Sequence, residues 1–101
     1  MKYKTTNNNG AVQVNIEGAL NFAANEDFHV LLDSVIKLAP CSVVFNLSAV
    51  SGIDSVGLGL LYIAQEDLAA MNAKLSLAAP RDGVLRLLEL TEASKTFEIL
   101  A

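Results

Sequence analysis

The sequence predicts an α/β domain with the element order β-β-α-β-α-β-α-β, a mostly parallel sheet, and helices mainly on one face of that sheet. Segments with a two-residue apolar period alternate with segments of helical period, which indicates strands and helices in turn. Repeated β-α-β units imply parallel neighbours joined by right-handed crossovers. A sheet covered on both faces has continuous apolar strands, whereas these strands alternate. The second face is therefore expected to be open to solvent or to a partner, and it carries Gln13, Asn15, Glu17, Asn46, Ser48 and Ser76.

The first half of the chain predicts a hairpin followed by a helix. A short strand over 2–6 and an alternating strand over 11–18 flank the turn Asn7-Asn8-Asn9-Gly10, because Asn and Gly tolerate positive φ. Helical periodicity begins at Asn25, which is predicted to be the N-cap. This helix is expected to end near Ala39-Pro40, because the residue before a proline avoids the helical region.

The second half of the chain repeats the pattern of strand and helix. Apolar alternation predicts strands over 41–48, 74–79 and 96–100. A loop of small residues is predicted over 49–53, a helix over 54–72, and a short helix capped by Asp82 with Val84, Leu87 and Leu88 facing inward.

Composition excludes several classes of protein. The 101 residues are 52% hydrophobic with a net charge of −4, which is too apolar for a disordered chain and too acidic for an obvious nucleic-acid binder. No apolar run approaches the ~18 residues that a membrane span needs, and the first ten residues lack a signal core. Cys41, the single cysteine, forms neither an internal disulfide nor a zinc site alone, and is interpreted as a small buried hydrophobe. We expect a soluble, cytoplasmic protein.

The most informative segment runs from Gly52 to Leu61, out of a loop and into a helix. Ser55 is expected at the helix N-terminus, where free N–H groups and the helix dipole stabilise negative charge. Gly57 and Gly59 are each about 0.8–1.0 kcal/mol worse than Ala in a helix, which indicates a close approach, either of the helix to the sheet or of a partner to the helix. In the alternative interpretation, Asp54 and Ser55 are only capping residues and the glycines only a packing notch.

Common catalytic patterns are absent from the sequence. Gly52 stands three residues before Ser55, so the spacing of a hydrolase nucleophile elbow fails. Tyr62 stands where a dinucleotide-binding fingerprint would need glycine. His29, the only histidine, falls on another predicted helix and is expected at the surface. The chain is therefore predicted not to be an enzyme and to hold neither a cofactor nor a metal.

The segment from Asn46 to Leu61 resembles the signature of the STAS domain, a family named for sulfate transporters and anti-sigma factor antagonists. The family pattern is an apolar strand, a D-L-S-like step and a D-S-[ST]-G-L-G loop and helix, which here reads Asp54-Ser55-Val56-Gly57-Leu58-Gly59. Gly18-Ala19-Leu20-Asn21 resembles the family's G-x-L-D step. Val56 replaces the usual Ser or Thr, and Asn21 the usual Asp. The resemblance implies a single STAS domain over 1–101.

The resemblance implies a switch protein that acts in transcription regulation and signal transduction. In bacterial anti-sigma factor antagonists, the Ser after the Asp accepts a phosphoryl group from a partner serine kinase that is also the anti-sigma factor. Carried over, the acceptor is Ser55, a serine phosphatase resets it, and ATP belongs to the kinase. The residues implied to contact the partner are Asn21, Asp54, Ser55, Val56, Gly57, Leu58 and Gly59.

Two other functions are compatible with a STAS domain. One is a constitutive subunit of a larger complex, such as a lipid-transport ABC system, in which Ser55 would only cap a helix. The other is a nucleotide-binding domain. The absence of Lys and Arg between Lys37 and Lys74 disfavours the nucleotide-binding alternative, because phosphate sites normally use cations.

Overall fold

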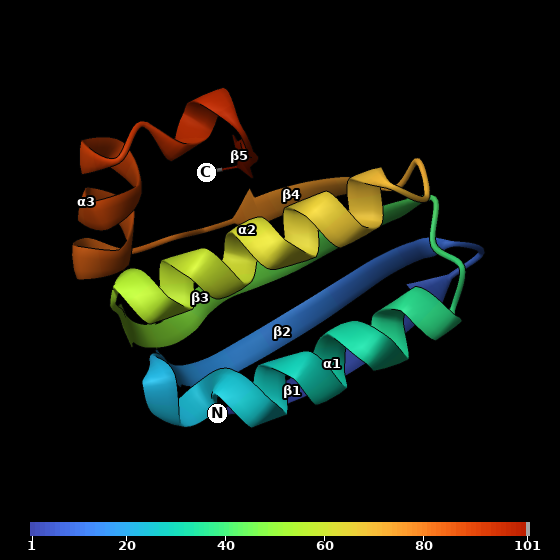
Figure 1. Cartoon of the computed structure of the whole chain (residues 1–101), viewed down its shortest axis with the longest axis horizontal. Helices are drawn as coiled ribbons and strands as arrows, with labels where there is room; N and C mark the ends of the chain where they lie inside the picture. Colours follow the sequence, from blue (N-terminus) through green and yellow to red (C-terminus); the bar gives the residue numbers. More distant parts are fainter. Residues whose placement is uncertain (101) are drawn as a thin grey trace.

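The computed structural model describes residues 1–100 and contains one sheet of five strands in the order β1-β2-β3-β4-β5 (Figure 1). Strand β1 pairs antiparallel with β2, and all other neighbours are parallel. The predicted mostly parallel α/β class is therefore confirmed. The strands are β1 (Lys2–Asn8), β2 (Ala11–Leu20), β3 (Ser42–Ile53), β4 (Lys74–Ala78) and β5 (Glu98–Leu100).

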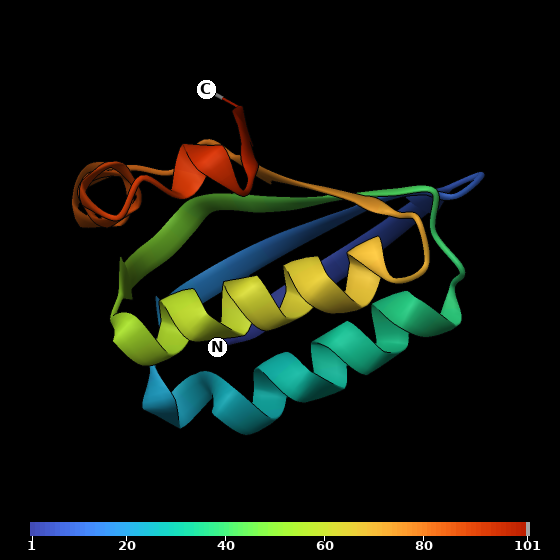
Figure 2. The ribbon, with the colours of Figure 1, turned by 45° about the horizontal axis from the view of Figure 1, so that its top comes forward.

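Two of the three α-helices form a layer on one face of the sheet. Figures 1 and 2 show α1 (Asn25–Lys37) and α2 (Ser55–Ala69) side by side against it, as the strand alternation predicts. The third helix, α3 (Asp82–Leu90), is separate from this layer and packs beside β3, the central strand. Two short 3₁₀ helices, η1 (Phe22–Ala24) and η2 (Ala93–Lys95), follow β2 and α3.

The core lies between the sheet and this helix layer. Phe28 of α1 meets Phe45 of β3 edge to face, with ring centroids 5.9 Å apart. Each fully buried side chain of this size contributes roughly 1.5–3 kcal/mol of transfer free energy. The alternating positions of β2 and β3 and the apolar stripe of α1 are buried here: Val12, Val14, Ile16, Val43, Phe45, Leu47, Phe28, Leu31, Leu32 and Val35.

The predicted hairpin is confirmed. Asn9 and Gly10 form the turn with φ of 54° and 93°, the left-handed conformations that these two residue types tolerate. The Gly10 N–H donates a hydrogen bond to Asn7 Oδ1 at 3.0 Å, which fixes the turn from inside.

Strand β3 is longer than predicted, because the small residues expected to form a loop over 49–53 continue the strand. They pair with β2, with Ala49 opposite Glu17 and Ile53 opposite Leu20. The last pair of β3 with β4 is Asn46 with Ala78, so the C-terminal part of β3 extends past the end of β4. That part lies beside α3.

The helix caps predicted at Asn25 and Asp82 are wrong. Asn25 has helical dihedrals (φ −55°, ψ −50°), and the chain enters α1 through η1, in which the Ala24 N–H donates to the Asn21 carbonyl at 3.0 Å. Asp82 lies inside α3 with φ of 49°, and Arg81 takes the cap position. In both places a local backbone turn replaces the side-chain cap.

The open face of the sheet is confirmed only in part. Gln13, Asn15 and Glu17 are exposed, and Asn46 and Ser48 are half-buried. Ser76 is buried, and its neighbours across the sheet are Val44 of β3 and Glu98 of β5. His29 is exposed as predicted, whereas Cys41 is exposed rather than buried because it lies just before β3 starts.

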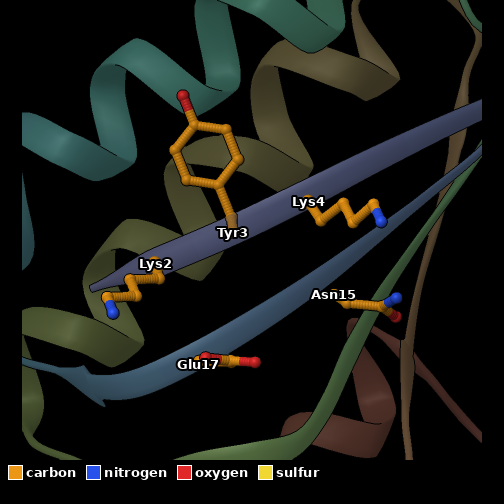
Figure 3. A pocket seen from close by; sticks show the side chains of 5 residues that line it. All are labelled: Lys2, Tyr3, Lys4, Asn15 and Glu17. Carbon is orange, nitrogen blue, oxygen red and sulfur yellow. The ribbon is translucent and has the colours of Figure 1, made fainter.

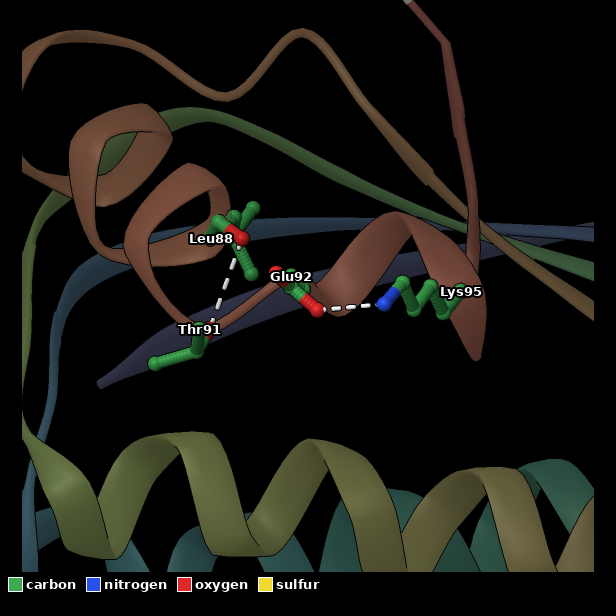
Figure 4. A network of polar contacts seen from close by, with 4 residues as sticks. All are labelled: Leu88, Thr91, Glu92 and Lys95. Atoms are coloured by element: carbon green, nitrogen blue, oxygen red, sulfur yellow. Dashed lines mark hydrogen bonds and ion pairs between the residues drawn. The ribbon is translucent and has the colours of Figure 1, made fainter.

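The chain leaves α3 through a short polar network (Figure 4). The Thr91 hydroxyl donates to the Leu87 carbonyl at 2.8 Å and lies 3.4 Å from the Leu88 carbonyl. Glu92 turns the chain with φ of 55°, and its carboxylate pairs with Lys95 across η2. The turn directs the chain back so that β5 joins the edge of β4.

Candidate functional site

Asp54 joins the end of β3 to the start of α2. Its Oδ1 accepts the Gly57 N–H at 2.8 Å, and its carbonyl accepts the Leu58 N–H at 2.9 Å. Its own N–H donates to the Leu20 carbonyl at 3.2 Å, at the end of β2. Asp54 is therefore the N-cap of α2, as one sequence interpretation predicts, and it also ties α2 to the end of β2.

Ser55 is the first residue of α2, and its side chain is exposed. Asp54 satisfies the Gly57 N–H, so within residues 1–100 the N–H groups of Ser55 and Val56 are left without an acceptor. These groups and the positive end of the helix dipole point toward the region around Ser55. A negative group on the Ser55 hydroxyl would be stabilised there.

Gly57 and Gly59 have different structural roles. A Cβ on Gly57 would lie 2.0 Å from the Leu20 carbonyl oxygen and 2.9 Å from Ile53 Cγ1. Gly57 is therefore required for the close approach of α2 to β2. A Cβ on Gly59 would meet no atom of residues 1–100 within 4 Å, so no contact inside the described chain requires glycine there.

The loop after β2 lies next to the start of α2, because Leu20 and Ile53 are paired at the ends of their strands. Asn21 is half-buried here, and its carbonyl opens η1. The next residue, Phe22, is 76% exposed, although it is a large aromatic. Phe22 is not among the site residues predicted from the sequence. Its position directly after Gly18-Ala19-Leu20-Asn21 is the sequence feature that could have indicated it.

The predicted partner-contact residues lie together at the carboxyl ends of β2 and β3, but they do not all face outward. Ser55 and Asp54 are exposed, and Val56 is 37% exposed. Gly57 is buried, and Leu58 packs against the core. Those two residues shape the site, and the side chains at positions 54–56 and Phe22 form its surface.

The Asp54 cap has a measurable energetic consequence. We expect Asp54→Ala to lower the free energy of unfolding by about 1 kcal/mol, because the Gly57 N–H loses its acceptor. Asp54→Asn retains an oxygen at the same place and is expected to lose much less. Urea unfolding of both variants, followed by circular dichroism, measures the difference. Equal losses would show that charge, rather than the capping hydrogen bond, is what matters.

A hollow on β1 and β2 is lined by Lys2, Tyr3, Lys4, Asn15 and Glu17 (Figure 3), and Tyr3 points away from Asn15 and Glu17. Within residues 1–100, no three His, Cys, Asp or Glu side chains group so that they could hold a metal ion. In the same part of the chain, no helix has the length and apolar character needed to cross a membrane.

Comparisons with known proteins agree with this arrangement. An anti-sigma factor antagonist from Mycobacterium paratuberculosis superposes with a TM-score of 0.87 at 24% identity, covering 98% of this chain and 84% of that chain. The phosphorylated form of the Bacillus cell fate determinant SpoIIAA gives 0.74 at 17% identity, covering 99% and 92%. A sulfate transporter family protein from Wolinella succinogenes gives 0.79 at 21% identity, covering 92% and 78%.

At these identities the three structures establish the fold alone. No curated protein matches the sequence. The model of the STAS domain family matches residues 2–101, which is nearly the whole chain. The motif from Asp54 to Gly59 corresponds in the structure to the Asp54 cap of α2 and to the contact of Gly57 with β2. Both lie within a sheet of the order β1-β2-β3-β4-β5. The chain therefore belongs to the STAS domain family.

Proposed function

We propose that this STAS chain is a phosphorylation-controlled protein-binding module of the anti-sigma factor antagonist type. It binds a partner anti-sigma factor that is also a serine kinase while Ser55 is unmodified, and phosphorylation of Ser55 releases that partner. The observation that carries the proposal is the exposed Ser55 hydroxyl at the first turn of α2, beside the Asp54 cap. The chain acts by binding rather than by catalysis, in the cytoplasm.

The position of Ser55 suits a phosphoryl acceptor. Its hydroxyl is open to an incoming kinase, and the free N–H groups of the first turn stabilise the phosphate in the unbound chain. Val56, which replaces the family's second hydroxyl, leaves this geometry unchanged. The kinase supplies ATP and a serine phosphatase removes the phosphate, so the chain needs no nucleotide site of its own.

Phosphorylation would weaken a complex through charge. The phosphate adds about −1.5 to −2 charges at neutral pH. Asp54 is its neighbour, and no Lys or Arg occurs between Lys37 and Lys74. Burial of the phosphate beside a carboxylate against a partner costs desolvation energy and adds like-charge repulsion. The unmodified form is therefore the form that binds.

The surface around Ser55 also suits a protein partner. Phe22 on η1 is 76% exposed and Val56 on α2 is 37% exposed, and η1 and α2 are in contact. Exposed aromatic side chains of this kind are typical anchors at protein interfaces. The likeness to anti-sigma factor antagonists supports such a partner, and the likeness to a sulfate transporter family protein keeps the constitutive subunit as the alternative.

The proposal is tested by mapping phosphate on the protein purified from its own cells. Mass spectrometry is expected to find stoichiometric phosphate on Ser55 in part of the population, and Ser55→Ala is expected to remove it. Ser51→Ala is the matched control, because Ser51 is also exposed but lies within β3. Absence of phosphate on Ser55 under all growth conditions would contradict the switch and favour the constitutive subunit.

A further inference from the structure

Strand β1 forms one edge of the sheet, and within residues 1–100 only its inner side is paired. Its seven residues face β2 in an unbroken register, which ends with Asn8 opposite Ala11. The two-residue turn between these two makes them a hydrogen-bonded pair, and bonded and non-bonded pairs alternate from there along the strand. The backbone N–H and C=O groups of Tyr3, Thr5 and Asn7 therefore point away from β2. None of them has a backbone partner in residues 1–100, so β1 can accept a further strand.

Two cations lie along this edge, on the sheet face that α1 and α2 do not cover. Lys2 and Lys4 are both exposed and stand opposite Glu17 and Asn15 of β2. Within residues 1–100 neither lysine forms an ion pair, although the chain as a whole has a net charge of −4. Directly opposed side chains on neighbouring strands interact, and opposite charges are favourable there. Lysines two residues apart therefore fit carboxylates at alternate positions of an added strand.

The acids near this edge do not cancel the two lysines. Neighbouring strands lie about 4.8 Å apart, so an added strand would be twice as far from Glu17 on β2 as from Lys2 and Lys4 on β1. Asp27 of α1 lies 4.0 Å from the amino group of Met1, which balances its charge. An incoming strand therefore meets the lysines first.

A second copy of this chain suits the edge less well than an acidic strand does. The antiparallel two-fold register that pairs Tyr3, Thr5 and Asn7 completely is centred on Thr5. It would place Lys2 and Lys4 of both copies on one face, with the two Lys4 side chains as diagonal neighbours about 7–8 Å apart. Lysines on edge strands are one means by which sheets avoid pairing edge to edge. The charges therefore select an acidic partner over a copy.

We infer that the outer edge of β1 binds an extended acidic segment of a partner protein, which joins the five-stranded sheet as an antiparallel strand. Its backbone pairs with the free N–H and C=O groups of Tyr3, Thr5 and Asn7. Its carboxylates stand at alternate positions, opposite Lys2 and Lys4. The residue between them lies opposite Tyr3, which is 37% exposed, so an apolar side chain is expected there. In strand addition of this kind, backbone hydrogen bonds supply affinity and alternate side chains supply specificity.

This contact does not depend on the function proposed above. Strand β2 lies between β1 and β3, and Ser55 begins the helix that follows β3. The added strand therefore binds whether or not Ser55 carries a phosphate.

Nuclear magnetic resonance of the isotope-labelled chain tests the inference with a capped peptide of sequence Val-Thr-Val-Glu-Val-Glu-Thr. Titration to about 1 mM at low salt is expected to give saturable shifts, with a dissociation constant on the order of 100 µM. Hydrogen exchange is expected to slow at the N–H groups of Tyr3, Thr5 and Asn7, and to change little at Lys4 and Thr6, whose N–H groups already face β2. A peptide with lysine in place of both glutamates is expected to bind at least ~10-fold more weakly.

Two variants separate the charges from the backbone. The double variant Lys2→Glu/Lys4→Glu is expected to weaken binding of the acidic peptide at least ~10-fold. Arg81→Glu/Arg86→Glu is the matched control, because it makes the same change in charge at exposed positions at the start of α3 and within it, and binding is expected to stay within about twofold. Thr5→Pro removes an N–H that has no partner on β2, and it is expected to weaken binding about fivefold in a folded chain. Circular dichroism checks the fold of each variant.

Three results would overturn the inference. One is the absence of shifts along β1 at about 1 mM peptide. Another is binding that Lys2→Glu/Lys4→Glu leaves unchanged. The third is protection of the Tyr3, Thr5 and Asn7 N–H groups that rises with the concentration of the chain alone, since this would assign the edge to a second copy.

Discussion

Gly57→Ala is expected to destabilise the fold by about 3 kcal/mol or more. The added methyl would lie 2.0 Å from the Leu20 oxygen and 2.7 Å from the Leu20 carbonyl carbon, and both are backbone atoms of a paired strand. Neither atom can move without breaking the bond from the Asp54 N–H or displacing the whole start of α2. Urea unfolding followed by circular dichroism measures the loss.

Gly59→Ala is the matched control in the same helix. The added Cβ would meet no atom within 4 Å in the described chain, so the substitution is expected to stabilise the fold by about 0.5–1 kcal/mol through helix propensity. Urea unfolding followed by circular dichroism measures this gain as well. If both substitutions had the same sign, the distinction between a packing glycine and an open glycine would be wrong.

The second large effect is expected at Ser55. Ser55→Asp is expected to weaken binding of the partner kinase about 100-fold, or about 2.8 kcal/mol, because it buries a second carboxylate beside Asp54. Ser55→Ala is expected to bind as the wild type does, because it adds no charge. Affinity capture with each variant as bait, quantified by mass spectrometry, measures the ratio.

Ser94→Asp controls for net charge, because Ser94 is exposed on η2. It is expected to retain the wild-type partner. Retention of the same partner at full strength by Ser55→Asp would contradict the switch while leaving a constitutive docking role intact.

Strand alternation predicts the fold well, because it reports which face of each strand is buried. Val12, Val14 and Ile16 are buried and Gln13, Asn15 and Glu17 are exposed, as the two-residue period requires. From that pattern alone the sheet had to carry its helices mainly on one face. The hairpin turn was equally predictable, because Asn9 and Gly10 are residue types that adopt positive φ.

Features that depend on distant pairing were not predictable. The residues from Ala49 to Ile53 have the composition of a loop, and they form a strand only because β2 offers partners as far as Leu20. Ser76 has the alternation of a solvent-facing position in its own strand, yet it is buried between the neighbouring strands, opposite Val44 of β3 and Glu98 of β5. The caps at Asn25 and Asp82 failed because backbone turns took over the role of the side chains.

The site was predictable as a motif but not in its details. Asp54 and Ser55 were identified by their order before a helix, and the structure places them at the first turn of α2. The different roles of Gly57 and Gly59 require the position of Leu20, which no local pattern contains. Phe22 stands out only when its 76% exposure is known, because Phe is among the residue types that are most often buried.

The central claim is that phosphate on Ser55 controls partner binding. Titration calorimetry of the purified partner with unmodified and Ser55-phosphorylated protein tests it most directly. The phosphorylated form is expected to bind at least ~100-fold more weakly, and removal of the phosphate by a serine phosphatase is expected to restore the affinity. Equal affinity of the two forms for the same partner would contradict the claim.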